Sequence, residues 1–138
     1  MAKALSVLVV DDDPLMLDLA VAALDSLGFG RISAALSGER GLRVLDDLGA
    51  DIVLCDLNMP EMDGVEFLRH LSARRYKGLI VLMSGEDQRI LRTAESLAKA
   101  HGLNVLGAVE KPIDAQVLGL IRDQIEPATK RSSRPAPA

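Results

Sequence analysis

Five short runs of aliphatic residues, each followed by a longer stretch with helical spacing, constrain the fold of this 138-residue chain more than any other feature. The five runs are Leu5–Val10, Arg31–Leu36, Asp51–Cys55, Leu79–Met83 and Val105–Val109. Such an alternation predicts a parallel sheet with helices on both faces. Within the third run, residues Ile52–Cys55 show no polar alternation, as expected for a central strand that is buried on both sides.

The stretches between the runs contain signals for the beginning and end of helices. The first helix is expected to begin at Pro14 after the N-cap Asp13, and Gly28 is expected to end it. The later helices are expected to begin after Ser37, after Asp63-Gly64, near Asp87 and after Asp114. The apolar residues predicted to face the core are Met16, Leu19, Ala20, Ala23, Leu24, Leu27, Leu42, Leu45, Val65, Leu68, Leu71, Leu91, Ala94, Leu97, Ala98, Val117, Leu118, Ile121 and Ile125.

Composition excludes several classes of protein. A net charge of −4 argues against a general binder of nucleic acid or of membrane surfaces, which needs an excess of Lys and Arg. The single cysteine, Cys55, excludes an internal disulfide framework, fits a reducing compartment such as the cytoplasm, and is expected to be a packing residue. No stretch reaches the roughly 18 apolar residues of a membrane span, and acidic residues interrupt the N-terminal apolar run too early for a signal peptide.

The length is that of one domain, and the composition changes near its end. Residues 1–126 are expected to form the domain. Residues 127–138 read PATKRSSRPAPA, without a large apolar residue and with three basic ones, which is typical of a flexible tail or linker. This segment could be a tether, a weak contact for anions or a solvated end.

Polar residues gather where four of the five runs end. Asp11 and Asp12 follow the first run, Asp56 follows the third, Ser84 follows the fourth, and Lys111 follows the fifth. In a parallel sheet of this kind, the ligand site lies beyond the carboxyl ends of the strands. The sequence therefore predicts that three carboxylates, a hydroxyl and an amine share one edge of the sheet.

These side chains together suit the chemistry of a phosphoryl group. Crowded carboxylates repel one another, and Mg²⁺, which takes oxygen ligands, relieves that repulsion and can bridge to a phosphoryl oxygen. Lys111 would pair with a second phosphoryl oxygen, and Ser84 could donate a hydrogen bond to a third. Asp56 ends the central strand, between the Asp11/Asp12 pair and Lys111, and is the best candidate for a nucleophile that forms an aspartyl phosphate.

Four segments, VLVVDDDP, LCDLNMPEMDG, VLMSGED and VEKPI, together resemble the receiver domain of two-component response regulators, the CheY-like group. The resemblance covers roughly residues 3–126. It implies a flavodoxin-like α/β fold of five βα units with strand order 2-1-3-4-5. It also implies a signalling role in which Asp56 accepts a phosphoryl group from a histidine kinase or a phosphotransfer protein, without steady turnover of an external substrate.

The resemblance assigns a ligand set for Mg²⁺. Asp12 would bind the ion directly, and Asp11 would act mainly through water. Asp56 would supply another ligand, and Asn58 would supply its backbone carbonyl.

The resemblance also places a switch hydroxyl at Ser84 and a phosphate-pairing lysine at Lys111. One position departs from the family pattern. The fifth strand usually carries Tyr or Phe three residues before the lysine, and this chain has Ala108 there. The usual coupling, in which the hydroxyl moves to the phosphate and an aromatic ring turns inward, cannot operate in that form.

The partners implied are a histidine kinase or phosphotransfer protein and an output protein or a fused effector domain. The segment RTAESLAKAHGLNVLGAVEKPI also resembles receivers that are fused to cyclic-dinucleotide phosphodiesterase (EAL) domains. A homodimer through the fourth and fifth helices is a further expectation, since Arg89, Arg92, Asp114 and Asp123 offer opposite charges. Neither a nucleic acid nor a membrane is an expected direct partner.

Two other functions stay open at this point. A phosphatase with an aspartyl nucleophile, as in the haloacid dehalogenase superfamily, also uses Asp, Ser or Thr, Lys and Mg²⁺, although its nucleophile normally follows the first strand. A degenerate receiver would act only as a binding module. The complete acidic set and Lys111 argue against that reading, and Ala108 argues slightly for it.

Overall fold

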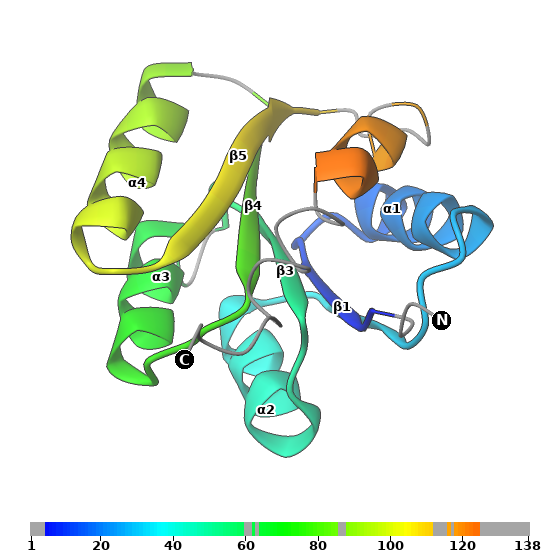
Figure 1. The fold of residues 1–138 in the computed structure, drawn as a ribbon, viewed down its shortest axis with the longest axis horizontal. Helices are drawn as coiled ribbons and strands as arrows, with labels where there is room; N and C mark the ends of the chain where they lie inside the picture. Colours follow the sequence, from blue (N-terminus) through cyan, green and yellow to red (C-terminus); the bar gives the residue numbers. More distant parts are fainter. Residues whose placement is uncertain are drawn as a thin grey trace, which may run out of the picture.

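Among the described residues, five parallel strands form one sheet with helices on both faces (Figure 1). The computed structural model describes residues 5–59, 62, 64–85, 88–111, 116 and 118–124. The strands are β1 (Val7–Val10), β2 (Ile32–Ala35), β3 (Ile52–Asp56), β4 (Leu79–Ser84) and β5 (Asn104–Glu110). Their order in the sheet is β2-β1-β3-β4-β5, which confirms the flavodoxin-like arrangement predicted from the sequence.

The helices are α1 (Pro14–Ser26), α2 (Gly38–Leu48), α3 (Gly64–Ala73) and α4 (Gln88–Ala100), and residues 116 and 118–124 are also helical. Figure 1 shows α1 and the helical residues 118–124 on one side of the sheet, with α2, α3 and α4 on the other. None of the helices in this part of the chain is long and apolar enough to span a membrane. The predicted tail, residues 127–138, lies outside the described residues.

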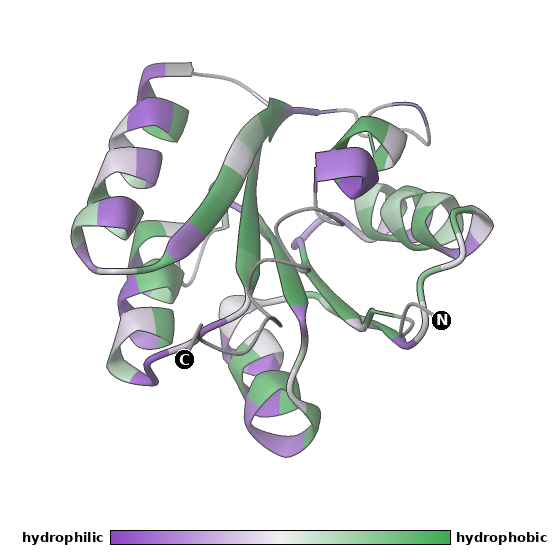
Figure 2. Cartoon of the chain, in the orientation of Figure 1, coloured by the Kyte–Doolittle hydropathy of each residue, from purple (hydrophilic) through white to green (hydrophobic). Residues whose placement is uncertain are grey.

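The three inner strands alternate between two apolar cores, as the period of two in a strand requires. In β3, Val53 and Cys55 face the core beneath α2, α3 and α4, whereas Ile52 and Leu54 face the core beneath α1. Every residue of β3 is buried, which confirms the prediction of a central strand. Figure 2 shows mainly apolar strands beside helices of mixed hydropathy, of which α4 is largely hydrophilic and α1 largely apolar. Cys55 is fully buried, as expected of a packing residue.

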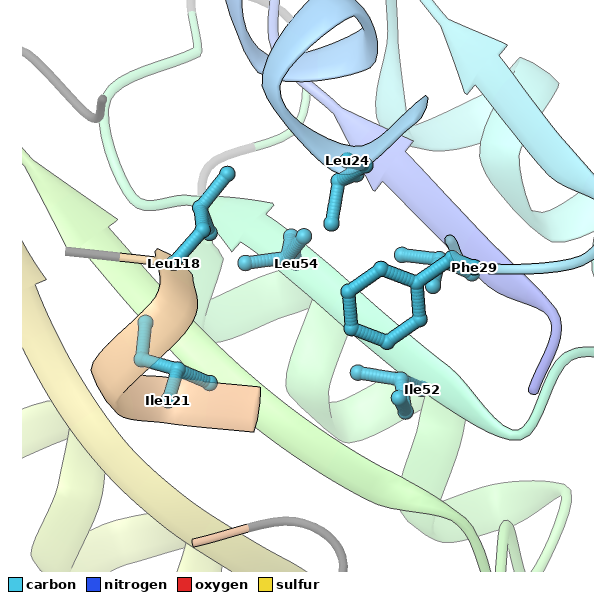
Figure 3. Close-up of a pocket in the computed structure, with 7 residues that line it drawn as sticks. Leu24, Phe29, Ile52, Leu54, Leu118 and Ile121 are labelled. Atoms are coloured by element: carbon cyan, nitrogen blue, oxygen red, sulfur yellow. The ribbon is translucent and has the colours of Figure 1, made fainter. Parts of the chain in front are cut away.

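The core beneath α1 closes around one aromatic ring (Figure 3). Phe29, which follows α1, packs with Leu24 and with Ile52 and Leu54 of β3. Leu118 and Ile121 close the other side. The residual cavity of about 10 Å³ is at the lower limit for one water molecule, and its apolar lining keeps it dry.

The ends of α1 follow the sequence prediction. The Asp13 carboxylate accepts a hydrogen bond from the backbone N–H of Leu15 at 3.0 Å, as an N-cap should. Gly28 has a φ of +81°, a left-handed conformation that glycine adopts without strain, and it follows the last turn.

The predicted core-facing side of α1 was wrong in part. Leu19 is 46% exposed, and the buried residues are Leu17, Ala20 and Leu24. Apolar residues occupy most positions of this helix, so their spacing alone does not single out one face. The sheet selects the face that carries Leu17.

Most of the core-facing residues predicted for the other helices are buried. They are Leu42, Leu45, Leu68, Leu71, Leu91, Ala94, Ala98, Leu118 and Ile121. Val65 and Leu97 are only half-buried, whereas Val117 and Ile125 lie outside the residues that can be described.

Hydrogen bonds between loops fasten the amino end of the sheet. The carboxylate of Asp51 accepts hydrogen bonds from the backbone N–H (2.8 Å) and hydroxyl (3.1 Å) of Ser6. The Tyr76 hydroxyl donates to the carbonyl of Ala50 at 2.9 Å. Burial raises the pKa of this hydroxyl, and the negative charge of Asp51 raises it further, so Tyr76 remains a proton donor throughout the neutral range.

The β5 edge contains an irregularity and a groove. Val105 pairs with Ile80 and Gly107 pairs with Val81, so the register shifts by one residue at Leu106. Gly107 lines a groove of about 270 Å³ between β5 and the helical residues 118–124. A Cβ atom at Gly107 would meet no neighbouring atom within 4 Å.

Candidate functional site

Three buried polar residues stand at the carboxyl ends of neighbouring strands. Asp11 directly follows β1, Asp56 is the last residue of β3, and Ser84 is the last residue of β4. They are 2%, 1% and 1% exposed, respectively. Val10 pairs with Cys55, so Asp11 and Asp56 come next on adjacent strands. The structure therefore brings together the buried part of the predicted set.

Lys111, directly after β5, reaches across this edge to both buried carboxylates. Its Nζ atom lies 2.7 Å from Oδ2 of Asp11 and 3.0 Å from Oδ2 of Asp56. Its backbone N–H donates to the carbonyl of Ser84 at 2.9 Å, which holds the end of β5 against the end of β4. Burial alone would lower the pKa of Lys111, but its hydrogen bonds to Asp11 and Asp56 outweigh burial and raise that pKa.

The surroundings of the Asp56 carboxyl group act on its pKa in opposite directions. Burial raises its pKa most, and the hydrogen bonds from the Asn58 backbone N–H and from Lys111 act in the opposite direction. The neighbouring charge of Asp11 raises it further, and the net result is a pKa of about 6. Asp56 is therefore mainly ionised at neutral pH, which a carboxylate nucleophile requires.

Asp12 completes a cluster of three carboxylates. Oxygen atoms of Asp11, Asp12 and Asp56 lie within 4.8 Å of one another, and Asp12 is exposed while the other two are buried. The backbone N–H of Asp13 donates to Oδ1 of Asp11 at 2.9 Å and fixes that carboxylate. Hard oxygen donors at this spacing fit a divalent cation such as Mg²⁺, with the exposed side open to water ligands.

The loop between β3 and α3 is packed tightly enough to fix its first residues. The backbone N–H of Leu57 donates to the carbonyl of Met83 at 2.9 Å, and that of Gly64 donates to the carbonyl of Leu57 at 3.1 Å. A Cβ atom on Gly64 would lie 2.6 Å from Cα of Leu57, so only glycine permits this approach. The start of α3 thereby supports the segment that carries Asn58.

Asn58 makes two hydrogen bonds within the site. Its backbone N–H donates to Oδ1 of Asp56 at 3.1 Å, and its side-chain Nδ2 donates to Oγ of Ser84 at 3.2 Å. The sequence predicted a ligand role for the backbone carbonyl of Asn58 and did not predict this contact between its side chain and Ser84. The side-chain contact could not be read from the sequence, because the direction of that amide depends on the backbone of the loop.

Other residues singled out from the sequence lie outside this cluster. Ala108 is exposed in β5 and pairs with Leu82. Because its side chain is a methyl group, β5 carries no aromatic ring at this position. The two histidines of the chain also lie away from the cluster, since His70 is in the last turn of α3 and His101 directly follows α4, where each helix returns to the amino end of the sheet. Asp114, which the sequence offered for a contact between two copies of the chain, lies outside the described residues.

Comparisons with known proteins agree with this geometry. The family model for the response regulator receiver domain matches residues 7–121. The cyclic di-GMP phosphodiesterase RocR of Pseudomonas aeruginosa is 36% identical over 81% of the chain, which spans only 29% of RocR. A probable chemotaxis protein CheY of Rhizobium etli is 31% identical over 80% of the chain and is matched over 88% of its own length.

Solved structures extend the likeness to the fold. A response regulator from Colwellia psychrerythraea is 33% identical, with a TM-score of 0.73 over 93% of this chain and 99% of that one. NtrX from Brucella abortus gives a TM-score of 0.82 over 94% of this chain and 28% of its own, at 22% identity, a likeness of fold alone.

Proposed function

Because this chain belongs to the response regulator receiver family, we propose that Asp56 is the residue at which it accepts a phosphoryl group. The single observation that supports this choice most is the contact between the Lys111 ammonium group and the buried Asp56 carboxylate. A cation already placed beside the nucleophile can pair with the negative oxygens of an incoming phosphoryl group. The proposed donor is a phosphorylated histidine of a kinase or phosphotransfer protein, and acetyl phosphate can replace it in a test.

The transfer is a single displacement at phosphorus. An oxygen of Asp56 forms a bond to phosphorus while the bond between phosphorus and the donor's histidine nitrogen breaks. The electron pair of the broken bond stays on the histidine ring. Lys111 turns from the carboxylates to a phosphoryl oxygen, and the Ser84 hydroxyl donates a hydrogen bond to another.

The carboxylates of Asp11, Asp12 and Asp56 and the backbone carbonyl of Asn58 would hold Mg²⁺. The ion, when bound, neutralises charge on the phosphoryl oxygens. The fit rests on the oxygen donors of the carboxylate cluster, which lie within 4.8 Å of one another. The two buried carboxylates have fixed positions, whereas the exposed Asp12 can adjust to the ion.

The output is a change in partner binding or in an attached domain. Curated relatives also include protein-glutamate methylesterases and transcriptional regulatory proteins, and the chain spans 29% of RocR and 32% of a methylesterase from Koribacter versatilis. Residues 1–126 would act in the cytoplasm as a receiver that controls such a domain, an EAL phosphodiesterase being one candidate, without steady turnover of its own. Exposed charges on Arg89, Arg92 and Asp123 would support a homodimer. The family match does not favour the aspartyl-phosphatase alternative.

The test is the intact mass of the chain after incubation with acetyl phosphate and Mg²⁺. Wild type should gain one phosphoryl group, and Asp56→Asn should gain none. Asp47→Asn, which changes an exposed carboxylate on α2, is the matched control and should behave like wild type. A wild-type chain that binds Mg²⁺ but gains no mass would contradict the proposal and favour the degenerate receiver.

A further inference from the structure

Asn58 makes hydrogen bonds to both of the strand-end residues that are the proposed nucleophile and the proposed switch hydroxyl. Its Nδ2 atom lies 3.2 Å from Oγ of Ser84, and its backbone nitrogen lies 3.1 Å from Oδ1 of Asp56. Asn58 itself is exposed, whereas Asp56 and Ser84 are each 1% exposed. An exposed residue thus makes hydrogen bonds to oxygen atoms of two buried residues.

The direction of the hydrogen bond matters. An amide nitrogen only donates, so the oxygen of Ser84 accepts in this contact. A serine hydroxyl can accept and donate at once, and accepting from one side directs its own hydrogen away from that side. The contact therefore restrains the position of the Ser84 oxygen and limits the directions in which its hydroxyl can donate.

We propose that Asn58 is a positioning residue for Ser84, which it holds in the orientation that donates to a phosphoryl oxygen on Asp56. This inference rests on the proposed function, because it presumes that Asp56 accepts the phosphoryl group. The backbone N–H of Asn58 also restrains the Asp56 carboxylate. The nucleophile and the Ser84 hydroxyl are therefore aligned before the molecule that carries the phosphoryl group binds.

A positioning role differs measurably from a direct one. If Asn58 acts through Ser84, its removal should matter only while the hydroxyl is present. If Asn58 instead contacts the phosphoryl group or a water molecule directly, its removal should matter equally with and without the hydroxyl. A double-mutant cycle separates these two cases.

The experiment measures the rate of phosphorylation by acetyl phosphate at saturating Mg²⁺, followed by intact mass, for Asn58→Ala, Ser84→Ala and the double variant. Each single variant should be slower by about three- to tenfold, the effect of one lost or misdirected hydrogen bond. The double variant should be no slower than Ser84→Ala. Asn104→Ala, which removes an exposed amide that donates to the carbonyl of Lys77 at the other end of the sheet, should leave the rate unchanged.

The positioning role would be overturned if the double variant slowed phosphorylation by the product of the two single effects. It would also be overturned if Asn58→Ala were phosphorylated as fast as wild type. A general structural defect would also slow the Ser84→Ala chain further, so it cannot imitate the expected result. Failure of wild type to accept a phosphoryl group would instead refute the proposed function, and the inference with it.

Discussion

The ammonium group of Lys111 lies 2.7 Å from Oδ2 of Asp11, a shorter contact than the 3.0 Å that joins it to Asp56. The side chain of Lys111 is 16% exposed, and that of Asp11 is 3% exposed. The pair is therefore largely withdrawn from water. A buried charge that loses its partner is strongly unfavourable, whereas a pair on the surface contributes little.

Replacing Lys111 with alanine should lower the free energy of unfolding by about 3 kcal/mol at neutral pH, because it leaves the carboxylates of Asp11 and Asp56 without their cation. Urea denaturation in the presence of a chelator measures this change. The control is Lys99→Ala, which removes an exposed partner of Glu95 at 3.7 Å and should cost less than about 0.5 kcal/mol. Equal effects of the two variants would contradict a special role for the buried pair.

Millimolar Mg²⁺ should raise the melting temperature, because the folded carboxylate cluster binds the ion and the unfolded chain does not. At ten times the dissociation constant, we expect a rise of roughly 5 °C. Asp12→Ala should lose most of this rise, whereas Asp18→Ala, which changes an exposed acid on α1, should keep it. The absence of a Mg²⁺ effect on wild type would refute the metal site.

Asp56→Asn should stabilise the metal-free chain at neutral pH, by on the order of 2 kcal/mol, because ionising a buried carboxyl opposes folding. The folded pKa of about 6 lies above the ordinary value of 3.8, so the folded state holds the proton more tightly. Wild type should therefore lose stability relative to the variant as pH rises from about 4 to about 6, and the difference should then stay constant.

Asp46→Asn is a control for this prediction, because it should change the pH dependence of stability in the opposite direction. The guanidinium of Arg74 makes two hydrogen bonds to the Asp46 carboxylate, at 2.8 and 3.1 Å, and they hold its pKa below the ordinary value. Asp46 thus contributes stability above pH 4 that is lost as pH falls through its lowered pKa. Denaturation curves between pH 3 and 8 should show the two variants diverging from wild type in opposite directions; parallel curves would contradict both assignments.

Gly64→Ala should destabilise the chain by about 2 kcal/mol, because its methyl group would overlap the backbone of Leu57. The displaced loop should also slow phosphorylation at Asp56. Gly107→Ala is the matched substitution, since a Cβ there would meet only the open groove beside β5. Thermal unfolding of the two variants measures the difference, and a Gly64→Ala chain as stable as Gly107→Ala would show that the loop adapts freely.

The fold could be predicted because its signals are local. The buried run of β3 and the caps at Asp13 and Ser37 each depend on a few neighbouring residues, and the structure contains all of them. The common edge of the site residues also follows from chain order, because every strand of a parallel sheet ends on the same side.

What could not be predicted depends on contacts between distant parts of the chain. α1 is apolar on more than one face, and the sheet decides that Leu17 is buried while Leu19 is exposed. The amide of Asn58 reaches Ser84, 26 residues away, because the ends of β3 and β4 lie side by side in the sheet. Neither choice has a signature in the spacing of residues.

The hydrogen bonds at the amino end of the sheet have a consequence for how far a charge at the site is felt. Asp51, which accepts from Ser6, precedes Asp56 by the length of β3, about 16 Å at the rise of an extended strand. That distance is twice the Debye length of about 8 Å at physiological ionic strength, and Asp51 is exposed to solvent. Asp56 is 1% exposed, so solvent screens its charge only in part, and the distance and the exposure of Asp51 weaken the effect of that charge on the amino end of the sheet.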